Sequence, residues 1–286
     1  MKHQTIVIII VLLLLCGGIF SYSRGKLTPE TVVRAPAQAR QAHFYKNSNV
    51  SIRDIVLKIV YVVPKSFRGK TVADFASALQ PHLDEIVKFH GLQMRGLSGV
   101  RYEIFAAPVI LEHENGFYDT ANTDRGNPEG LLNISAEVYR RVFSPGGDLY
   151  DERFAAKDSG EYPVLGLIYE GVGTSGSAIY ESELDSAGEI AKQLGIPVSG
   201  VRIVGLNNIE GFFILNREFL TREEYVYAGD SILYHEFAHT FGLADSYNEE
   251  TNQPIFMDIM GGGRNDPLKI AYIEKATLRD LGIVGN

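Results

Sequence analysis

Two histidines and a glutamate lie close together in the segment His235-Glu236-Phe237-Ala238-His239. Residues four positions apart on a helix share one face, so both imidazoles can point at the same metal ion. Glu236 is near enough to reach a metal-bound water without being a ligand itself. This pattern arises by chance roughly 0.01 times in a chain of this composition, so it indicates metal chemistry.

The residues after this segment supply a third ligand. Gly242 can adopt the left-handed conformation that ends a helix, and Asp245 follows three residues later. We therefore expect the carboxylate of Asp245 to return to the two histidines and to leave one coordination position for water. Two imidazoles, one carboxylate and a water are the layout of a catalytic zinc site, whereas a structural zinc site has four protein ligands.

The same residues allow other interpretations. A buried helix can satisfy two histidines and a glutamate with ordinary hydrogen bonds and an ion pair, although burying them without a partner is costly. Two histidines and one carboxylate also form the facial triad of non-haem iron, which makes an iron oxidoreductase an alternative function. A non-catalytic binding module that contains zinc is a second alternative. The glutamate between the histidines favours hydrolysis over both.

Strands and helices alternate irregularly along the part of the chain that must position these residues. The active-site helix is expected over residues 231–241, with Asp230 as its N-cap and Gly242 at its end. Further helices are predicted at residues 71–90, 182–194 and 267–281, and Pro81 is expected to bend or split the first of them. Strands are predicted at residues 55–63, 100–111, 163–169, 177–180, 201–206 and 212–215, with a loop at 113–130. This order predicts an α+β fold with a mixed sheet.

The segment from His235 to Asp245 resembles the metzincin clan of zinc metallopeptidases. The third ligand of that clan is usually a histidine, and Asp245 stands in its place here, as in snapalysin-like enzymes. The continuation to Tyr247 is also similar to immune inhibitor A and to IgA-cleaving metallopeptidases. The resemblance covers about 30 residues, from Ser231 to Gly263.

A methionine-bearing turn beneath the metal is a further feature of the clan. The sequence Asp258-Ile259-Met260-Gly261-Gly262-Gly263 resembles it, with Met260 as the residue under the zinc and Met257 as a weaker candidate. Several clan members have a tyrosine two residues after the methionine. The equivalent position here is Gly262, so no role is expected for such a tyrosine.

The resemblance implies a metzincin-like zincin domain, with a mixed twisted sheet, an active-site helix, a Met-turn and a C-terminal helix. It implies a zinc-dependent endopeptidase that acts on protein or peptide substrates. One catalytic Zn²⁺ would be held by His235, His239 and Asp245, and Glu236 would be the general base that accepts a proton from the attacking water. The negative charge of Asp245 would make the bound water less acidic, which predicts a neutral to alkaline optimum.

Composition limits the class of protein. The chain has 286 residues, of which 45% are hydrophobic and 22% are charged, and these values exclude a mostly disordered chain, a collagen and a multi-span membrane protein. The formal net charge of -8 argues against a nucleic-acid partner. The only cysteine, Cys16, lies in an apolar segment near the start, so neither disulfides nor cysteine ligands are expected elsewhere.

The first residues have the pattern of an export signal, because Lys2 precedes an apolar stretch at residues 6–20. Residues 1–23 are interpreted as a cleaved signal peptide or as a retained N-terminal membrane anchor. Lipidation of Cys16 is a third, less favoured interpretation. Residues 24–50 have the composition of a linker or an inhibitory pro-segment, and residues 51–286 form the expected metallopeptidase domain, exported across the cytoplasmic membrane.

A loop with several oxygen-bearing side chains is a candidate for Ca²⁺. Its residues are Asp119, Asn122, Asp124 and Asn127. Carboxylate and amide oxygens are suitable calcium ligands, but a solvated loop explains the same composition.

Overall fold

The strand β3 (Asp54–Val63) lies at the centre of the sheet, because its branched aliphatic side chains are buried on both faces. In the computed structural model, the described residues are 40–65, 67, 74–118, 128–171, 178–180, 209–248, 251 and 253–285. Strands β4 (Gly99–Ile104) and β6 (Glu161–Tyr169) run parallel to β3 on either side. Continuous apolar sequence in β3 and β6 is what a sheet covered on both faces requires.

The sheet has six strands in the order β4-β3-β6-β8-β7, and β5 (Val109–Ile110) also pairs with β3. Strand β8 (Gly211–Asn216) is parallel to β6, whereas β7 (Ala178–Tyr180) is antiparallel to β8. The mixed sheet expected from the sequence is therefore present, with a parallel centre. The predicted strand at residues 100–111 is interrupted after Ile104 and forms both β4 and β5.

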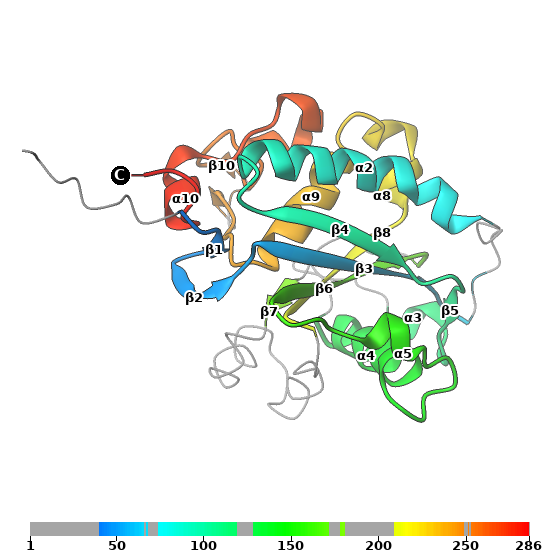
Figure 1. The fold of residues 1–286 in the computed structure, drawn as a ribbon. Helices are drawn as coiled ribbons and strands as arrows, with labels where there is room; N and C mark the ends of the chain where they lie inside the picture. Colours follow the sequence, from blue (N-terminus) through cyan, green and yellow to red (C-terminus); the bar gives the residue numbers. More distant parts are fainter. Residues whose placement is uncertain are drawn as a thin grey trace, which may run out of the picture. The chain divides into compact units, whose positions relative to one another are not determined.

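Helices cover the two faces of the sheet (Figure 1). On one face lie α2 (Phe75–Gln93) and α9 (Gly229–His239), and on the other lie α3 (Asn115–Tyr118), α4 (Pro128–Val138), the π-helical turn η1 (Tyr139–Phe143) and α5 (Glu152–Ala155). Alternate residues of β3 face the two cores: Leu57 and Ile59 pack beneath α2 and α9, and Val60 and Val62 pack against α4 and η1. This alternation follows from the two-residue period of a strand.

Lys58 is the exception among the buried residues of β3, because it carries a charge on the face that packs against α5. Its ammonium group donates hydrogen bonds to the carbonyl oxygens of Phe154 and Ala156, the latter 2.8 Å away. It also lies 3.6 Å from the carboxylate of Glu103. Burial lowers the pKa of Lys58, and Glu103 opposes that shift. Lys58 thus ties the end of α5 to the central strand.

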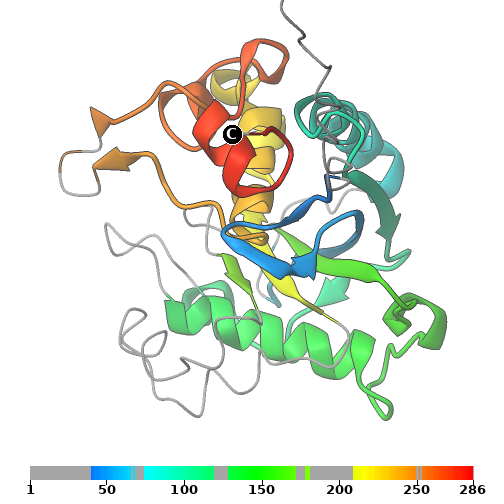
Figure 2. The same cartoon turned by 60° about the vertical axis from the view of Figure 1, so that its left-hand side comes forward.

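A short hairpin precedes β3 and joins the two ends of the folded unit Arg40–Asn286. It consists of β1 (His43–Phe44) and β2 (Asn47–Ser51), seen beside the C-terminal helix in Figure 2. The amide of His43 donates to the carbonyl of Leu281, and the amide of Tyr45 donates to that of Phe241, both at 3.1 Å. Residues 24–50 were expected to form a linker or a pro-segment, and these long-range bonds place the part from residue 40 onwards with the folded unit.

The C-terminal part is less helical than predicted. The helix expected over residues 267–281 is wrong in extent: η5 (Leu268–Ile270) and α10 (Lys275–Asp280) flank an extended stretch at residues 271–274. The carbonyl of Tyr272 accepts a hydrogen bond from the amide of Ile259, and the amide of Ile273 donates to the side chain of Gln93. The backbone of residues 271–274 thus bonds to distant parts of the chain, where a helix would bond to residues four positions away.

Two other predictions differ from the structure in detail. The first helix, which Pro81 was expected to bend or split, continues through this residue without a break. The predicted loop at residues 113–130 contains α3 and the first turn of α4. The remaining short elements are α8 (Glu218–Thr221), η3 (Glu223–Tyr225), β9 (Tyr247–Asn248), β10 (Gln253–Pro254) and η4 (Gly262–Asn265). The helix predicted at 182–194 and the strand predicted at 201–206 lie outside the described residues.

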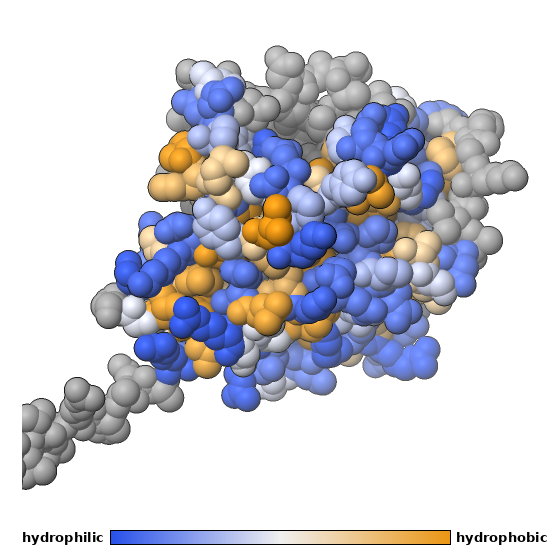
Figure 3. Space-filling view, turned by 90° about the horizontal axis from the view of Figure 1, so that it is seen from above, coloured by the Kyte–Doolittle hydropathy of each residue, from blue (hydrophilic) through white to orange (hydrophobic). Residues whose placement is uncertain are grey.

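Viewed from the side of α2, the surface mixes hydrophilic side chains with scattered apolar ones (Figure 3). Among the residues that the structure describes, no helix combines the length and the apolar character needed to cross a bilayer. The apolar stretch at residues 6–20 lies outside them.

Candidate metal centre

Helix α9 positions the two histidines because most of its surface is buried between the sheet and α2. Leu233, Tyr234 and Phe237 belong to the core on this face. His235 and Glu236 are 3% and 7% exposed, so the helix carries two polar side chains into an otherwise apolar interior. Burial of such groups is costly unless each one has a partner.

The beginning of α9 differs from the prediction. Ala228 occupies the N-cap position and provides no side-chain cap, and Asp230 lies in the first turn. The carboxylate of Asp230 is 2.6 Å from Nδ1 of His82, which belongs to α2. A negative charge in the first turn is favourable at a helix N-terminus, so Asp230 stabilises both the start of α9 and its contact with α2.

A buried hydrogen-bond network connects α9 with α2 and with the residues just before β3 and β4. His90 of α2 lies between the hydroxyl of Tyr234, at 3.1 Å, and that of Ser98, at 2.8 Å. Ser98 in turn donates a hydrogen bond to the carbonyl oxygen of Ile52 at 2.5 Å. Burial lowers the pKa of His90 to about 3, so this imidazole is neutral in the folded protein.

Gly242 ends the helical segment, as predicted, in a left-handed conformation with φ of 94°. A Cβ atom at this position would lie 2.5 Å from a ring carbon of Phe44 in strand β1. Both the backbone angle and the close approach therefore require glycine. The chain reverses here and brings Asp245 back towards α9.

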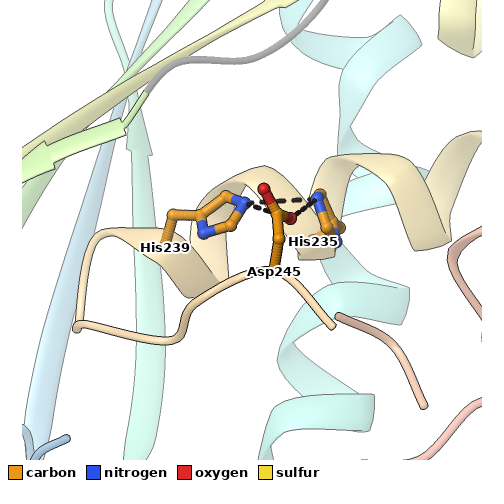
Figure 4. Close-up of side chains that lie close together, drawn as sticks. All are labelled: His235, His239 and Asp245. Carbon is orange, nitrogen blue, oxygen red and sulfur yellow. Dashed lines mark hydrogen bonds and ion pairs between the residues drawn. The ribbon is translucent and has the colours of Figure 1, made fainter. Parts of the chain in front are cut away.

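The structure brings His235, His239 and Asp245 to one point (Figure 4). The Nε2 atoms of the two histidines are 3.2 Å apart. Oδ1 of Asp245 lies 3.2 Å from Nε2 of His235 and 3.3 Å from Nε2 of His239. This group can hold a metal ion, since each residue offers one ligand atom to the same position.

The other ring nitrogen of each histidine is held by a backbone carbonyl. Nδ1 of His235 donates to the carbonyl oxygen of Ile259 at 3.0 Å, and Nδ1 of His239 donates to that of Leu243 at 2.6 Å. These bonds fix the tautomer that leaves Nε2 without a proton, which is the form that binds a metal. Three lone-pair-bearing atoms then face one another, and a cation between them removes their repulsion.

Within this group, burial and the neighbouring charges shift the pKa values of the side chains in opposite directions. Burial alone would raise the pKa of Asp245, but its interactions with His235 and His239 hold it well below the usual range. Burial alone would lower the pKa of His239, but Asp245 and Glu236 raise it above its ordinary value. In the absence of a metal, a proton thus competes for the position between the imidazoles and the carboxylate.

Glu236 lies beside the three ligand residues. Burial raises its pKa above the ordinary value of 4.5, and the neighbouring charges of His235 and His239 oppose the shift. A carboxylate whose pKa is raised accepts a proton more readily than an ordinary carboxylate.

The methionine of the predicted turn is Met260, which is 1% exposed, whereas Met257 is 56% exposed. Two neighbouring carbonyls of this turn accept hydrogen bonds from one candidate ligand residue and from the residue that follows another. The carbonyl of Ile259 accepts from His235, and that of Met260 accepts from the amide of Ser246 at 2.8 Å. The turn therefore supports a histidine ligand and the residue that follows Asp245.

Two further residues extend the site on the side of His235. The ring of Tyr247 stacks against that of His235, with centroids 6.5 Å apart. The guanidinium carbon of Arg264 lies 3.9 Å from the centroid of Tyr247. Burial raises the pKa of Tyr247, and Arg264 opposes that shift. Sequence reasoning missed Arg264, because a lone arginine in a glycine-rich segment has no distinguishing pattern.

The predicted ligands His235, His239 and Asp245 are brought together, with Glu236 and the Met260 turn beside them. The carbonyls of Leu243 and Ile259 were not predicted, since backbone groups carry no signal in the residue types. The candidate calcium residues Asp119, Asn122, Asp124 and Asn127 lie outside the described residues. No protein-family model matches the chain, and no curated protein matches it either.

Proposed function

We propose that the protein is an exported zinc-dependent endopeptidase of the metzincin type. One observation carries this proposal: Nε2 of His235, Nε2 of His239 and Oδ1 of Asp245 converge within 3.3 Å of one another, beside the buried carboxylate of Glu236. The arrangement combines three protein ligands with a general base, which is the composition of a hydrolytic zinc site.

The glutamate between the two histidines favours a zinc hydrolase over the iron oxidoreductase that two histidines and one carboxylate also allow. A general base beside the three ligand residues serves the hydrolysis of a peptide bond.

Zinc bound here would lower the pKa of a water molecule and polarise the carbonyl of a peptide bond. The chain's own residues supply the proton transfers. The carboxylate of Glu236 accepts a proton from the attacking water and delivers it to the departing amine. The carbonyls of Ile259 and Leu243 hold the two imidazoles in one tautomer, so the ligand set does not reorganise during the reaction.

The place of action follows from the sequence of the leader. Residues 1–23 have the pattern of a signal peptide or an N-terminal anchor, so we propose that the domain acts outside the cytoplasmic membrane, secreted or tethered. A protein or peptide substrate in that compartment fits the proposed reaction.

The variant Glu236→Gln tests the proposed function. It removes the base but keeps both imidazoles and Asp245, so we expect it to retain one zinc per chain and to lose nearly all hydrolysis of a panel of denatured proteins. Metal content is measured by elemental analysis of protein purified without added metal, and a chelator should abolish the activity of the unmutated protein. Retained hydrolysis in the variant, or iron in place of zinc, would contradict the proposal.

A further inference from the structure

Asp258 is a buried acidic residue at the start of the turn that contains Met260. It is 1% exposed, and its backbone carbonyl accepts hydrogen bonds from the amides of Gly261 and Gly263 at 3.0 and 2.9 Å. Burying a carboxylate is costly unless hydrogen bonds or an opposite charge compensate it. The side chain of Asp258 takes no part in the proposed reaction, so its burial calls for another explanation.

The groups around this carboxylate belong to three separate segments of the chain. Its hydrogen bonds come from the side chain of Ser246 and from the backbone amides of Met260 and Glu274. Burial raises the pKa of Asp258, the charge of Glu274 adds to that shift, and the three hydrogen bonds oppose it. Among the described residues Oδ1 has no hydrogen-bond partner, so the other oxygen of the carboxylate is the acceptor.

Two of these segments adjoin the proposed metal ligands. Ser246 directly follows the ligand Asp245, and its side chain bonds to the carboxylate of Asp258. Asp258 in turn precedes Ile259, whose carbonyl accepts the hydrogen bond from Nδ1 of His235. The carboxylate therefore joins the segment that supplies one proposed ligand to the backbone that orients another.

The backbone on either side of this carboxylate has little freedom to shift. The amide of Ile259 donates a hydrogen bond to the carbonyl of Tyr272 at 2.8 Å. A Cβ atom on Gly263 would lie 2.7 Å from the carbonyl oxygen of Asp258, which shows how tightly the turn is packed. Because the turn is fixed in this way, its carboxylate can hold Ser246 at a defined distance from it.

We propose that Asp258 is a positioning residue of the metal centre, whose carboxylate holds the segment after Asp245 against the turn that orients His235. Groups that orient metal ligands from outside the ligand set contribute to affinity, and their loss typically weakens metal binding roughly ten- to a hundredfold. The acceptor oxygen of Asp258 performs this role and its negative charge does not, since burial disfavours the charge. The inference rests on the proposed function, to which it adds a residue outside the ligand set.

Zinc affinity and the spectrum of cobalt-substituted protein test this proposal without requiring turnover. Asp258→Ala removes the acceptor oxygen, so we expect zinc to bind roughly ten- to a hundredfold more weakly in competition with a chromophoric chelator. The visible absorption of bound cobalt depends on the arrangement of its ligands and should change in the same variant. Asp258→Asn keeps one acceptor oxygen and should bind zinc within about threefold of the unmutated protein.

Glu137→Gln is the matched control, because Glu137 is another buried carboxylate and lies in α4 on the opposite face of the sheet. It accepts hydrogen bonds from the hydroxyl of Tyr118 and from the amide of Glu112, both at 2.6 Å. The control should lower the resistance to urea and leave zinc affinity and the cobalt spectrum unchanged. The comparison thus separates a positioning role from a general contribution to folding.

Two results would overturn the proposal: Asp258→Ala with unchanged zinc affinity and cobalt spectrum, or Asp258→Asn with as large a loss as Asp258→Ala. If Asp258→Ala does not fold, Ser246→Ala takes its place, since it removes one donor to the carboxylate. It should weaken zinc binding roughly three- to tenfold, and unchanged affinity would again contradict the proposal.

Failure of the proposed function has a different signature. Unmutated protein that binds zinc but hydrolyses nothing contradicts the peptidase proposal alone, and the metal measurements still decide the role of Asp258. Unmutated protein that takes up no metal contradicts both proposals.

Discussion

Nδ1 of His235 donates a hydrogen bond to the carbonyl oxygen of Ile259, 3.0 Å away, so the segment that contains Met260 holds this candidate ligand from behind. The bond connects His235 of α9 to a residue 24 positions further along the chain, next to the buried Met260. It explains in physical terms why the turn belongs to the site although none of its side chains is a proposed ligand. The backbone of Ile259 fixes the imidazole, and the side chain of Met260 is buried in the core on this face of the sheet.

Gly242→Ala should destabilise the protein and weaken its affinity for zinc. The new Cβ would meet Phe44 at 2.5 Å, in a backbone conformation that disfavours side chains. Gly146→Ala is the matched control, because Gly146 also has a positive φ but has nothing within 4 Å of an added Cβ. We expect about 1 kcal/mol for the control and more than about 3 kcal/mol for Gly242→Ala, measured by urea unfolding.

A zinc titration separates the two effects of this substitution. Only Gly242→Ala should weaken zinc binding, because only that turn carries Asp245. Equal losses of stability and unchanged zinc affinity in both variants would show that the turn does not position the ligand.

Zinc affinity should fall as the pH is lowered. Asp245 and Glu236 raise the pKa of His239 against the effect of burial, and a protonated imidazole does not bind a metal. Affinity is therefore greatest above the raised pKa of His239 and decreases as the pH falls through it. Competition with a chromophoric chelator between about pH 8 and 5 measures this change. A flat profile over that interval, or a rise at acid pH, would contradict the arrangement of ligands.

His90 should make the folded state less stable at acid pH. Its pKa is lowered from 6.5 to about 3 by burial, so the unfolded chain binds a proton below about pH 6.5 that the folded chain does not. Stability is lost as the pH falls from 6.5 towards 3, by up to about 1.4 kcal/mol for each pH unit. The metal-free protein and its His90→Asn variant should differ in this slope by one proton in urea unfolding. Identical slopes would show that His90 is not buried in the neutral form.

Lys58→Met should destabilise the fold by about 1–3 kcal/mol, because two buried carbonyls would lose their donor. The partners are the carbonyl oxygens of Phe154 and Ala156. Lys88→Met on the exposed surface of α2 is the control and should change stability by less than about 0.5 kcal/mol. Thermal and urea unfolding measure both variants, and a neutral or stabilising result at position 58 would mean that burying the charge costs as much as its bonds contribute.

The sequence was sufficient to predict the ligand cluster, because its signal is local. The spacing of His235 and His239 follows from the helical repeat, and Gly242 accounts for the return of Asp245. The central strand β3 was equally easy to predict, because a run of branched aliphatic residues favours a buried strand. In both cases the interactions that decide the structure occur within a few residues.

Features that depend on distant partners could not be predicted in this way. Residues 271–274 are extended because their backbone bonds to Ile259 and Gln93, and neither partner is nearby in sequence. The same holds for the hairpin at residues 43–51, which bonds to Phe241 and Leu281. Arg264 was missed for a related reason, since its significance comes from the ring of Tyr247 on which it lies.

The contact between Phe44 and Gly242 limits how far the N-terminus can be shortened. Strand β1 lies at the start of the folded unit, yet its aromatic ring buttresses the bend that delivers the carboxylate of Asp245. We expect a shortened protein that begins at Ala42 to keep this support, because Phe44 and the hydrogen bond from Tyr45 to Phe241 remain. A protein that also lacks Phe44 would lose the ring behind Gly242, and we expect the carboxylate of Asp245 to be held less firmly beside the two histidines.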